Sequence, residues 1–262
     1  MEAIGFIGFG GIAESVLTTL KYEAESELDV VGILVREAEG RPEQLPFVAN
    51  LVQLIERRPR VIAECASHEA VSCYGEDVLR SGADLIVVST GALADSALHD
   101  RLKAAAYETG SKLILPSGAI GALDALSSAR LGGLERVRYR SRKPPKAWKG
   151  TPAEDTINLD QLTVPKVIYQ GTARQAALLY PKNSNAAATV ALAGLGFEDT
   201  EVELVADPTT SSNIHEIDVQ AKSGSFFITL SGKPSPNNPR TSMLTAYNVA
   251  RALLYYDRPI VI

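Results

Sequence analysis

In the first 115 residues, short apolar runs alternate with stretches of helical periodicity. Runs of four to six mostly apolar residues predict strands, and apolar residues recurring every three or four positions predict helices. The predicted strands are 3–7, 30–35, 61–65, 85–88 and 113–115, and the predicted helices are 12–22, 48–57, 68–80 and 93–109. Such apolar strands, separated by helices, are typical of a parallel sheet covered on both faces. We therefore expect an α/β domain of the doubly wound, Rossmann type.

After Pro116 the predicted strands follow one another more closely, which favours an α+β domain with a mainly antiparallel sheet. The segment 143–165 contains four prolines and is expected to be a long loop. A closing helix is expected over 239–256, with Asn238 as its N-cap and Pro239 at its first position. The remaining predicted strands are 135–142, 167–171, 201–206, 214–221 and 226–231, and the remaining helices are 173–179 and 185–195.

The expected domains are therefore 1–120, a dinucleotide-binding domain, and 121–238, a substrate and catalytic domain. The closing helix is expected to pack back on the first of them, as such helices often do in two-domain dehydrogenases.

Composition narrows the class of protein. With 262 residues, 45% hydrophobic and 22% charged, the chain can bury a substantial core. It has no run of about 18 uncharged apolar residues that could span a bilayer, and the apolar stretch 3–9 lacks the basic leader of a signal peptide. Cys65 and Cys73 are too few for a disulfide framework or a four-cysteine zinc site, so we expect no metal and a cytoplasmic protein. A net charge of −5 argues against nucleic-acid binding.

A G-x-G-x-x-A motif follows the first predicted strand and opens the first predicted helix. Its first glycine permits a tight turn, its second lets the backbone approach a pyrophosphate, and its alanine lets the helix pack closely on the sheet. The helix N-terminus adds N–H donors for the anion. A purely structural glycine turn is the alternative, but the strand–turn–helix context favours dinucleotide binding. The expected cofactor-binding residues are Gly8, Gly10, Gly11, Ile12 and Ala13.

The end of the second strand bears on which dinucleotide binds. An acidic residue there would hold the ribose 2′-hydroxyl of NAD, but this chain has Arg36, followed by Glu37. Arg36 could stack on adenine or bind a 2′-phosphate, and Glu37 keeps NAD admissible; both could instead belong to a solvated loop. The cofactor is therefore predicted to be NAD or NADP.

Small polar residues follow the later strands, in the segments 65–68, 89–92 and 116–121. Ligands of open α/β sheets bind outside the carboxyl ends of the strands. Ala66 and Ser89 are therefore expected to contact the cofactor near its nicotinamide half, although each segment could instead be a simple tight turn.

His215 differs from the other two histidines, because His99 lies on a polar helical face and His68 opens a helix. In the strand 214–221, His215 shares one face with Ile217 and Val219. A histidine at such a position is often a hydrogen-bonded core residue. Desolvation can also tune its proton affinity for acid–base catalysis.

The turn 180–184 precedes an alanine-rich helix. Asn183 or Ser184 can cap this helix, which would leave N–H groups and Lys182 near one point. That arrangement suits an anion or a carboxamide, and a well-capped packing helix is the alternative.

Residues 136–149 contain seven positive charges and no acid, so the rest of the chain carries −12. Alternation places the arginines at 136, 138, 140 and 142 on one strand face, expected to be solvated or in a subunit contact. The lysines that follow, including Lys146, could attract a small polyanionic substrate. No interleaved aromatic residues accompany the charge, so a nucleic-acid partner is not expected.

Several stretches together resemble L-aspartate dehydrogenases, in the family order and over nearly the whole chain. They are 5–13, 115–124, 143–148, 180–189, 213–217 and 231–239. The glycine motif is generic, whereas the later stretches are specific.

The resemblance implies oxidation of L-aspartate by NAD(P)+ to iminoaspartate, followed by hydrolysis to oxaloacetate and ammonia, or the reverse. In this family iminoaspartate can feed NAD synthesis. His215 matches the family's active-site histidine, and Ala119 and Asn185 match its cofactor contacts. We expect His215 to manage protons and activate the hydrolytic water, and Lys146 and Lys182 to meet the substrate carboxylates. A homo-oligomer, dimer or tetramer, and no membrane association are also expected.

Two other interpretations stay open on the sequence. A related NAD(P)-dependent reductase acting on another small dicarboxylate imine or semialdehyde would share the first half of this chain. A dinucleotide-binding sensor without turnover would share its glycine motif, although the histidine within its motif argues against this.

Overall fold

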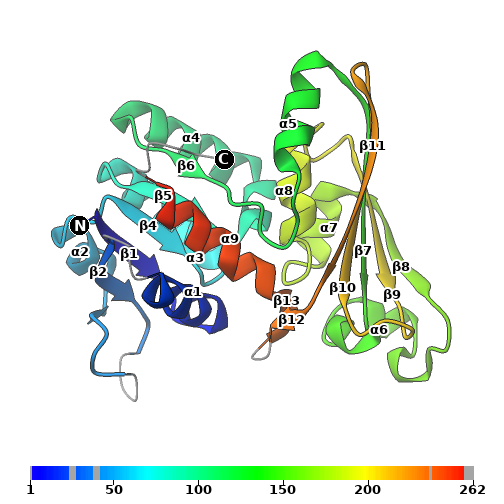
Figure 1. Cartoon of the computed structure of the whole chain (residues 1–262), viewed down its shortest axis with the longest axis horizontal. Helices are drawn as coiled ribbons and strands as arrows, with labels where there is room; N and C mark the ends of the chain where they lie inside the picture. Colours follow the sequence, from blue (N-terminus) through cyan, green and yellow to red (C-terminus); the bar gives the residue numbers. More distant parts are fainter. Residues whose placement is uncertain (1, 24–27, 38–41, 236–237, 257–262) are drawn as a thin grey trace. The chain divides into compact units, whose positions relative to one another are not determined.

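The computed structural model describes residues 2–23, 28–37, 42–235 and 238–256 (Figure 1). The chain divides into two compact units, one formed by residues up to 116 together with those from 246 onward, and the other by residues 117–245. They are called unit 1 and unit 2 below, and each is described by itself.

Unit 1 is built on a six-stranded sheet in the order β3-β2-β1-β4-β5-β6, and every pair of neighbouring strands is parallel. This confirms the predicted doubly wound sheet. Its strands are β1 (Glu2–Ile7), β2 (Leu28–Leu34), β3 (Phe47–Val48), β4 (Val61–Glu64), β5 (Asp84–Val87) and β6 (Leu113–Ile114).

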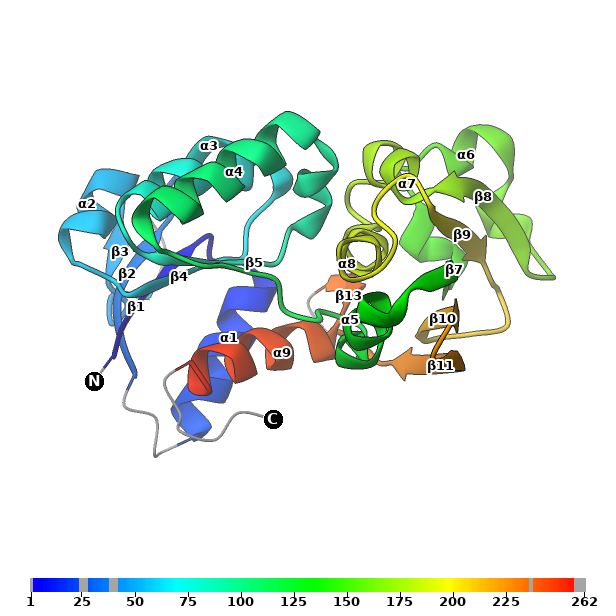
Figure 2. The same cartoon turned by 90° about the horizontal axis from the view of Figure 1, so that it is seen from above.

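The helices of unit 1 cover both faces of this sheet. Figure 2 shows α3 (His68–Arg80) and α4 (Ser96–Thr109) on one face, and α1 (Gly11–Tyr22) and α9 (Met243–Leu254) on the other. The core between the sheet and the second pair combines strand residues such as Ile4 and Phe6 with residues of α1 and α9. Those helix residues are Ala13, Val16, Leu20, Ala246, Val249, Ala250 and Leu253.

Two sequence predictions for unit 1 need correction at their boundaries. The helix expected over 48–57 is α2 (Leu51–Glu56), because β2 draws residues 47–48 into the sheet through the bond from Val35 N to Val48 O (3.2 Å). The helix expected over 93–109 is divided into a 3₁₀ segment, η1 (Thr90–Ala94), and α4, because the Asp95 carboxylate accepts from the amides of Ala97 and Leu98 and starts a new helix there.

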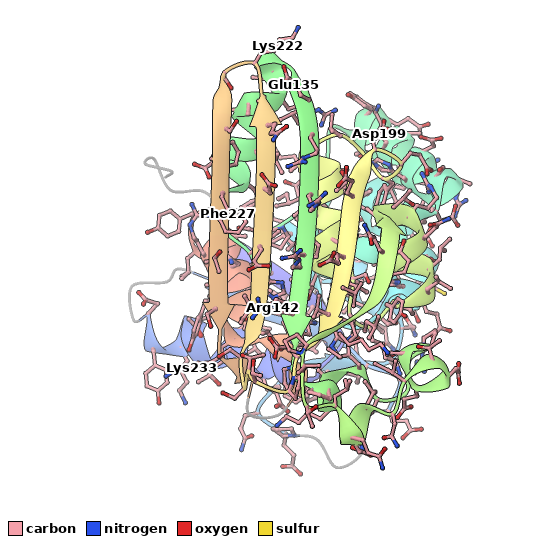
Figure 3. The ribbon with its side chains drawn as sticks, turned by 90° about the vertical axis from the view of Figure 1, so that its right-hand side faces the viewer. Glu135, Arg142, Asp199, Lys222, Phe227 and Lys233 are labelled. Atoms are coloured by element: carbon pink, nitrogen blue, oxygen red, sulfur yellow. The ribbon has the colours of Figure 1, made fainter. Side chains whose placement is uncertain are left out.

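Unit 2 contains a five-stranded sheet in the order β11-β10-β7-β9-β8. Only the β7–β9 pair is parallel, so the sheet is mainly antiparallel as predicted, with one parallel pair. The strands are β7 (Leu134–Lys143), β8 (Lys166–Thr172), β9 (Thr200–Ala206), β10 (Asn213–Ala221) and β11 (Gly224–Gly232). Helices α5 (Leu123–Gly132), α7 (Ala173–Leu179) and α8 (Asn185–Ala193) lie over one face (Figure 1), and Figure 3 looks onto the opposite face.

Two further differences from the sequence predictions lie in unit 2. The segment 143–165 is not a plain loop, because it includes η2 (Pro145–Trp148), α6 (Ala153–Thr156) and η3 (Leu159–Gln161). Helix α5 was not predicted, because it buries only Leu126 and Ala129 and has no side-chain cap.

The closing helix begins later than the Asn238–Pro239 pair predicts, and that prediction is wrong. Residues 238–242 form β13 (Asn238–Ser242), which pairs antiparallel with β12 (Pro234–Ser235). The helix starts only after this pairing ends. The amide of Leu244 then donates to the Ser242 hydroxyl (3.3 Å), so Ser242 takes the place expected of Asn238.

Candidate functional site

A pocket of about 740 Å³ lies in unit 1 where β1, β2 and β4 end. Of the residues expected to bind a cofactor, it brings together Gly8, Gly10, Arg36 and Ala66. Parallel strands present their carboxyl ends at one edge of a sheet, which is where ligands of this architecture bind. The pocket is therefore where the sequence places the dinucleotide.

The backbone at the glycine motif fits a pyrophosphate. Gly8 has φ +92°, and a Cβ there would lie 2.7 Å from the Cβ of Ala66. Its amide donates to Leu34 O (2.8 Å), which fixes the turn between β1 and α1. Gly10 is the N-cap of α1, no side chain caps that helix, and a Cβ on Gly10 would meet open space. The first turn of α1 therefore offers uncapped N–H groups toward an anion.

The other three residues of the motif have a packing role. Ala13 is fully buried in the core beneath α1. Gly11 and Ile12 are half-buried in the first turn of that helix. None of the three lines the pocket, so any contact they make with a ligand would come from their backbone.

Sequence reasoning missed Glu64, the last residue of β4, which is 1% exposed. Its Oε1 accepts from Ala66 N (2.7 Å) and Ser89 Oγ (2.9 Å), and its Oε2 accepts from Ser89 N (3.0 Å). Burial raises the pKa of Glu64, while the same hydrogen bonds oppose that shift. Glu64 thus ties the segments after β4 and β5 together. An acid ending an otherwise apolar strand was the signal that could have revealed it.

Arg36 forms an ion pair with an acid from helix α3, whereas the rule for NAD sites expects an acid at the end of the second strand. Its Nη2 lies 2.7 Å from Oε2 of Glu69, in the first turn of α3, and both side chains line the pocket. The partner is 33 residues away in sequence, so no local pattern could have indicated it.

In unit 2, His215 is 2% exposed and belongs to the inward face of β10. Its Nδ1 lies 2.6 Å from the hydroxyl of Tyr139 on β7, and the two rings are nearly parallel with centroids 6.0 Å apart. Directly beside His215 in the sheet are Ser141 of β7 and Leu230 of β11. The histidine is therefore held from a neighbouring strand rather than from its own.

Burial dominates the proton equilibria of this pair. Desolvation, and then the positive charge of Lys143, lower the pKa of His215 to about 3. Desolvation also raises the pKa of Tyr139 above its usual range. Both rings are consequently neutral near pH 7.

Lys143 was assigned to the loop from the sequence, and that assignment is wrong. It is the last residue of β7, 3% exposed, and alternates with the arginines so that it faces the same side as Tyr139. Its Nζ lies 5.6 Å from the centroid of the Trp148 ring. Lys143 is an even number of residues from Tyr139 and an odd number from each arginine. This spacing was the overlooked signal that it belongs to the buried face of the strand.

The segments 143–148 and 180–185 are joined directly. Asn183 Nδ2 donates to Ala147 O (3.0 Å), and the Trp148 ring meets the Tyr180 ring edge-on. The expected side-chain cap of α8 is absent: Ser184 stands at the N-cap, but its hydroxyl donates to Ala176 O (2.9 Å).

The remaining predicted residues of unit 2 lie in two places. Lys146 and Lys182 are exposed, and each is next in sequence to one partner of the Asn183–Ala147 hydrogen bond. Asn185 opens α8. Ala119 lies in a turn before α5 that is closed by Ile120 N donating to Ser117 O (3.1 Å).

The arginines of β7 are not a bare basic patch. On the outward face, shown in Figure 3, each of the four has an acidic partner. The pairs are Arg136–Asp218 (2.8 Å), Arg138–Glu201 (2.9 Å), Arg140 with Glu203 (2.5 Å) and Glu216 (3.5 Å), and Arg142–Asp207 (3.0 Å). The charge excess read from the sequence is therefore largely cancelled across the sheet.

Two family models match this chain. Residues 124–256 match the model described as "Aspartate dehydrogenase, C-terminal", and residues 8–116 match "Homoserine dehydrogenase, NAD binding domain". The division between the two models falls near the boundary between the two units.

Curated relatives and solved structures agree with these models. The chain is 45% identical to an L-aspartate dehydrogenase of Cupriavidus taiwanensis over 257 residues, and 45% identical to that of Pseudomonas aeruginosa over 260; each alignment covers 97% of both chains. A crystal structure of aspartate dehydrogenase from Thermotoga maritima superposes with a TM-score of 0.81 at 27% identity, covering 100% of this chain and 99% of that one. An archaeal homoserine dehydrogenase in complex with NADPH, at 11% identity and a TM-score of 0.62, shares the fold and covers 100% of this chain and 99% of its own. Within the described residues, no helix has the length and apolar character needed to cross a membrane.

Proposed function

The chain belongs to the L-aspartate dehydrogenase family, and we propose that it oxidises L-aspartate with NAD+ or NADP+ to iminoaspartate, which water converts to oxaloacetate and ammonia. The reverse amination uses the same groups. The observation that carries the proposal is the buried His215–Tyr139 pair on a strand face of one unit, in a chain whose other unit has a dinucleotide pocket.

Unit 1 is assigned the cofactor. Gly8 and Gly10 would hold the pyrophosphate against the first turn of α1, and Glu64 keeps the segments of Ala66 and Ser89 in place. When bound, the nicotinamide supplies the hydride acceptor. Ala119 and Asn185 are proposed as further cofactor contacts, supported by the family resemblance of their sequence segments.

Unit 2 is assigned the substrate. The open N-terminus of α8 favours anions, and Lys146 and Lys182 flank the hydrogen bond that joins their two segments. We propose that these groups bind the two carboxylates of aspartate. Both lysines are exposed, so their side chains can reach a ligand.

The hydrogen bond between Tyr139 and His215 defines the role of the histidine. Tyr139 stays protonated, and we propose that its hydroxyl donates to Nδ1 of His215, 2.6 Å away, with Ser141 as its second hydrogen-bonding neighbour. The ring proton is then on Nε2, which can donate but not accept. The role expected from the sequence, activation of water, needs an unprotonated Nε2.

We therefore propose that Nε2–H of His215 donates a hydrogen bond to the substrate. Oxidation removes a hydride from Cα and releases a proton from the amine to solvent; water then adds to Cα of the imine, and ammonia leaves the adduct. The oxygen of this water becomes the carbonyl oxygen of oxaloacetate. It accepts the hydrogen bond from Nε2–H of His215. In the reverse direction the same hydrogen bond polarises that carbonyl for attack by ammonia.

Nitrogen-15 NMR of the labelled histidine ring tests this role. We expect Nε2 to be protonated and Nδ1 to be unprotonated in the wild type, and a mixture of tautomers in Tyr139→Phe. A wild-type ring protonated on Nδ1 would reverse the role and restore the base function.

Steady-state kinetics test the activity itself. L-aspartate should reduce NAD+ or NADP+, and oxaloacetate with ammonia should oxidise NADH or NADPH. Activity confined to another dicarboxylate imine or semialdehyde would make the chain a related reductase. Cofactor binding without turnover on a broad panel of such substrates would make it a sensor.

Three broader features belong to the same proposal. Homo-oligomer formation, as a dimer or tetramer, is supported by exposed apolar side chains on the unit 2 sheet, Phe227 (62% exposed) and Val167 (47%), and light scattering during size-exclusion chromatography tests it. A cytoplasmic location is supported by the exposed thiol of Cys73, which a reducing compartment preserves. Supply of iminoaspartate to NAD synthesis follows from the product.

A further inference from the structure

The ribose end of the pocket in unit 1 has an unusual charge arrangement. Where an acid would end β2 in a strict NAD site, the chain has Arg36. Glu69 of α3 brings its carboxylate to within 2.7 Å of that guanidinium. Besides Glu37, which follows Arg36 in sequence, a helix thus supplies an acid here through space.

Arg36 and Glu69 are also the only Arg, Lys, His, Asp or Glu side chains among the described residues that line this pocket. The other lining residues are apolar residues, glycines, Ser67, Tyr74 and the two cysteines. Among the described lining residues, discrimination by charge between a ribose hydroxyl and a ribose phosphate therefore rests on this pair.

We propose that Glu69 and Arg36 together set the nucleotide preference: Glu69 accepts the 2′-hydroxyl of NAD(H), and Arg36 binds the 2′-phosphate of NADP(H) after its ion pair with Glu69 opens. This inference rests on the dinucleotide pocket of the proposed function. It assigns a specificity role to a residue of α3, outside the glycine motif and outside the end of β2.

Opening the pair costs little. The two side chains are 83% and 70% exposed, and ion pairs exposed to this degree contribute little net free energy. A 2′-phosphate offers Arg36 a more highly charged partner than a carboxylate does. The same phosphate is repelled by Glu69, so the two residues act in opposite directions and both cofactors are accepted.

The test is a fluorescence titration of the full chain with NADH and with NADPH, without substrate. Glu69→Gln removes the repulsion, so we expect NADPH to bind roughly tenfold more tightly and NADH to bind a few-fold more weakly. Arg36→Gln should weaken NADPH roughly tenfold and leave NADH within about twofold. The ratio of the two affinities is the quantity that decides.

Glu76→Gln is the matched control. It removes one negative charge from the same helix, where Glu76 pairs with Arg80 and Arg101 instead of lining the pocket. We expect its affinity ratio to equal that of the wild type. Circular dichroism checks that each variant is folded.

The outcomes separate this inference from the proposed function. Equal affinity changes for both nucleotides in Glu69→Gln, or none, would overturn the specificity role while leaving the pocket intact. A shift in the ratio equally large in Glu76→Gln would reduce the effect to general charge. A wild-type chain that binds neither nucleotide would overturn the proposed cofactor site instead.

Discussion

Side chains alternate between the two faces of strand β7, and the polar groups on one face are partly exposed while those on the other are buried. One face, on which Figure 3 labels Arg142, carries four arginines by alternation along β7, each a third or more exposed and each beside an acid from β9, β10 or the segment after β9. On the covered face are Tyr139, Ser141 and Lys143, all buried, with His215 beside them on β10.

The comparison shows that burial, and not the number of charged residues on a face, is what shifts the pKa values of groups on this strand. On the outer face, opposite charges meet in contact with water and largely cancel. On the inner face, removal of water lowers the pKa of His215 and raises that of Tyr139. A strand that reads as a basic run from its sequence thus contributes its chemistry through the residues between the arginines.

The largest expected effect is on the inner face. His215→Ala removes the proposed hydrogen-bond donor, and loss of one such donor lowers kcat by roughly 10²–10³. NADH affinity should be unchanged, because His215 neither lines the dinucleotide pocket nor belongs to the proposed cofactor contacts. Steady-state kinetics and fluorescence titration measure the two quantities. Full turnover in this variant would remove His215 from the mechanism.

The second-largest effect is expected for Asp207, the one fully buried acid among the partners of the four arginines. Asp207, the partner of Arg142, is fully buried, and its Oδ1 accepts from the hydroxyl (2.6 Å) and amide (2.8 Å) of Thr209. Burial alone would raise the pKa of Asp207, but Thr209 and then Arg142 hold it below its usual range. Asp207→Asn should cost about 3 kcal/mol of unfolding free energy, the lower end for a broken buried pair, because Arg142 still reaches water.

Urea unfolding measures that loss, and Glu201→Gln provides the matched control. Glu201 pairs with Arg138 on the same face but is half exposed. Equal losses for the two variants would contradict the distinction between buried and exposed acids.

Acid should destabilise the protein through His215. The folded pKa of about 3 lies below the unfolded value of 6.5, so the unfolded chain takes up the proton first as the pH falls. Stability from this residue is complete above about pH 6.5 and is lost as the pH falls toward 3. Between pH 7 and pH 5 the loss is about 2 kcal/mol.

This pH effect is measured by urea unfolding at both pH values, in the wild type and in His215→Gln. The neutral side chain should make the pH-dependent loss smaller by that amount. An identical pH dependence in both proteins would mean that His215 is not desolvated in the folded state.

The smallest effect is expected for an exposed pair of the outer face. Arg138 and Glu201 are 40% and 51% exposed, so a double-mutant cycle with Arg138→Gln and Glu201→Gln should give a coupling of about 0.2–1 kcal/mol. Salt at 1 M should weaken it further. A coupling that rivals the effect of Asp207→Asn would erase the contrast between the two faces.

Local signals account for the elements that could be predicted well. Helices α3 and α7 have the bounds expected from the sequence, because Ser67 and Thr172 cap them with their own side chains. One prediction was wrong because strand pairing overrides a capping signal: β12 pairs with residues 238–242 and displaces the Asn–Pro start of α9. Helix α5 was overlooked because so little of it is buried.

The candidate site divides in the same way. Alternation along β10 predicts the apolar environment of His215, and the glycine motif predicts the turn at Gly8. Tyr139 is 76 residues from its histidine, so its role depends on the pairing of β10 with β7. The role of Lys143 depends on β7 extending one residue further than its arginine run.

By itself, the sequence determined the parallel sheet of unit 1, the turn at Gly8 proposed to receive a pyrophosphate, and the strand face that carries His215. These follow from periodicity and from the conformations open to glycine, which are local properties of the chain. Only the tertiary structure decided that Tyr139 holds Nδ1, that acids cancel the arginines, and that Glu69 meets Arg36. Each of these contacts joins elements far apart in sequence, and register and packing, rather than local propensity, determine which groups meet.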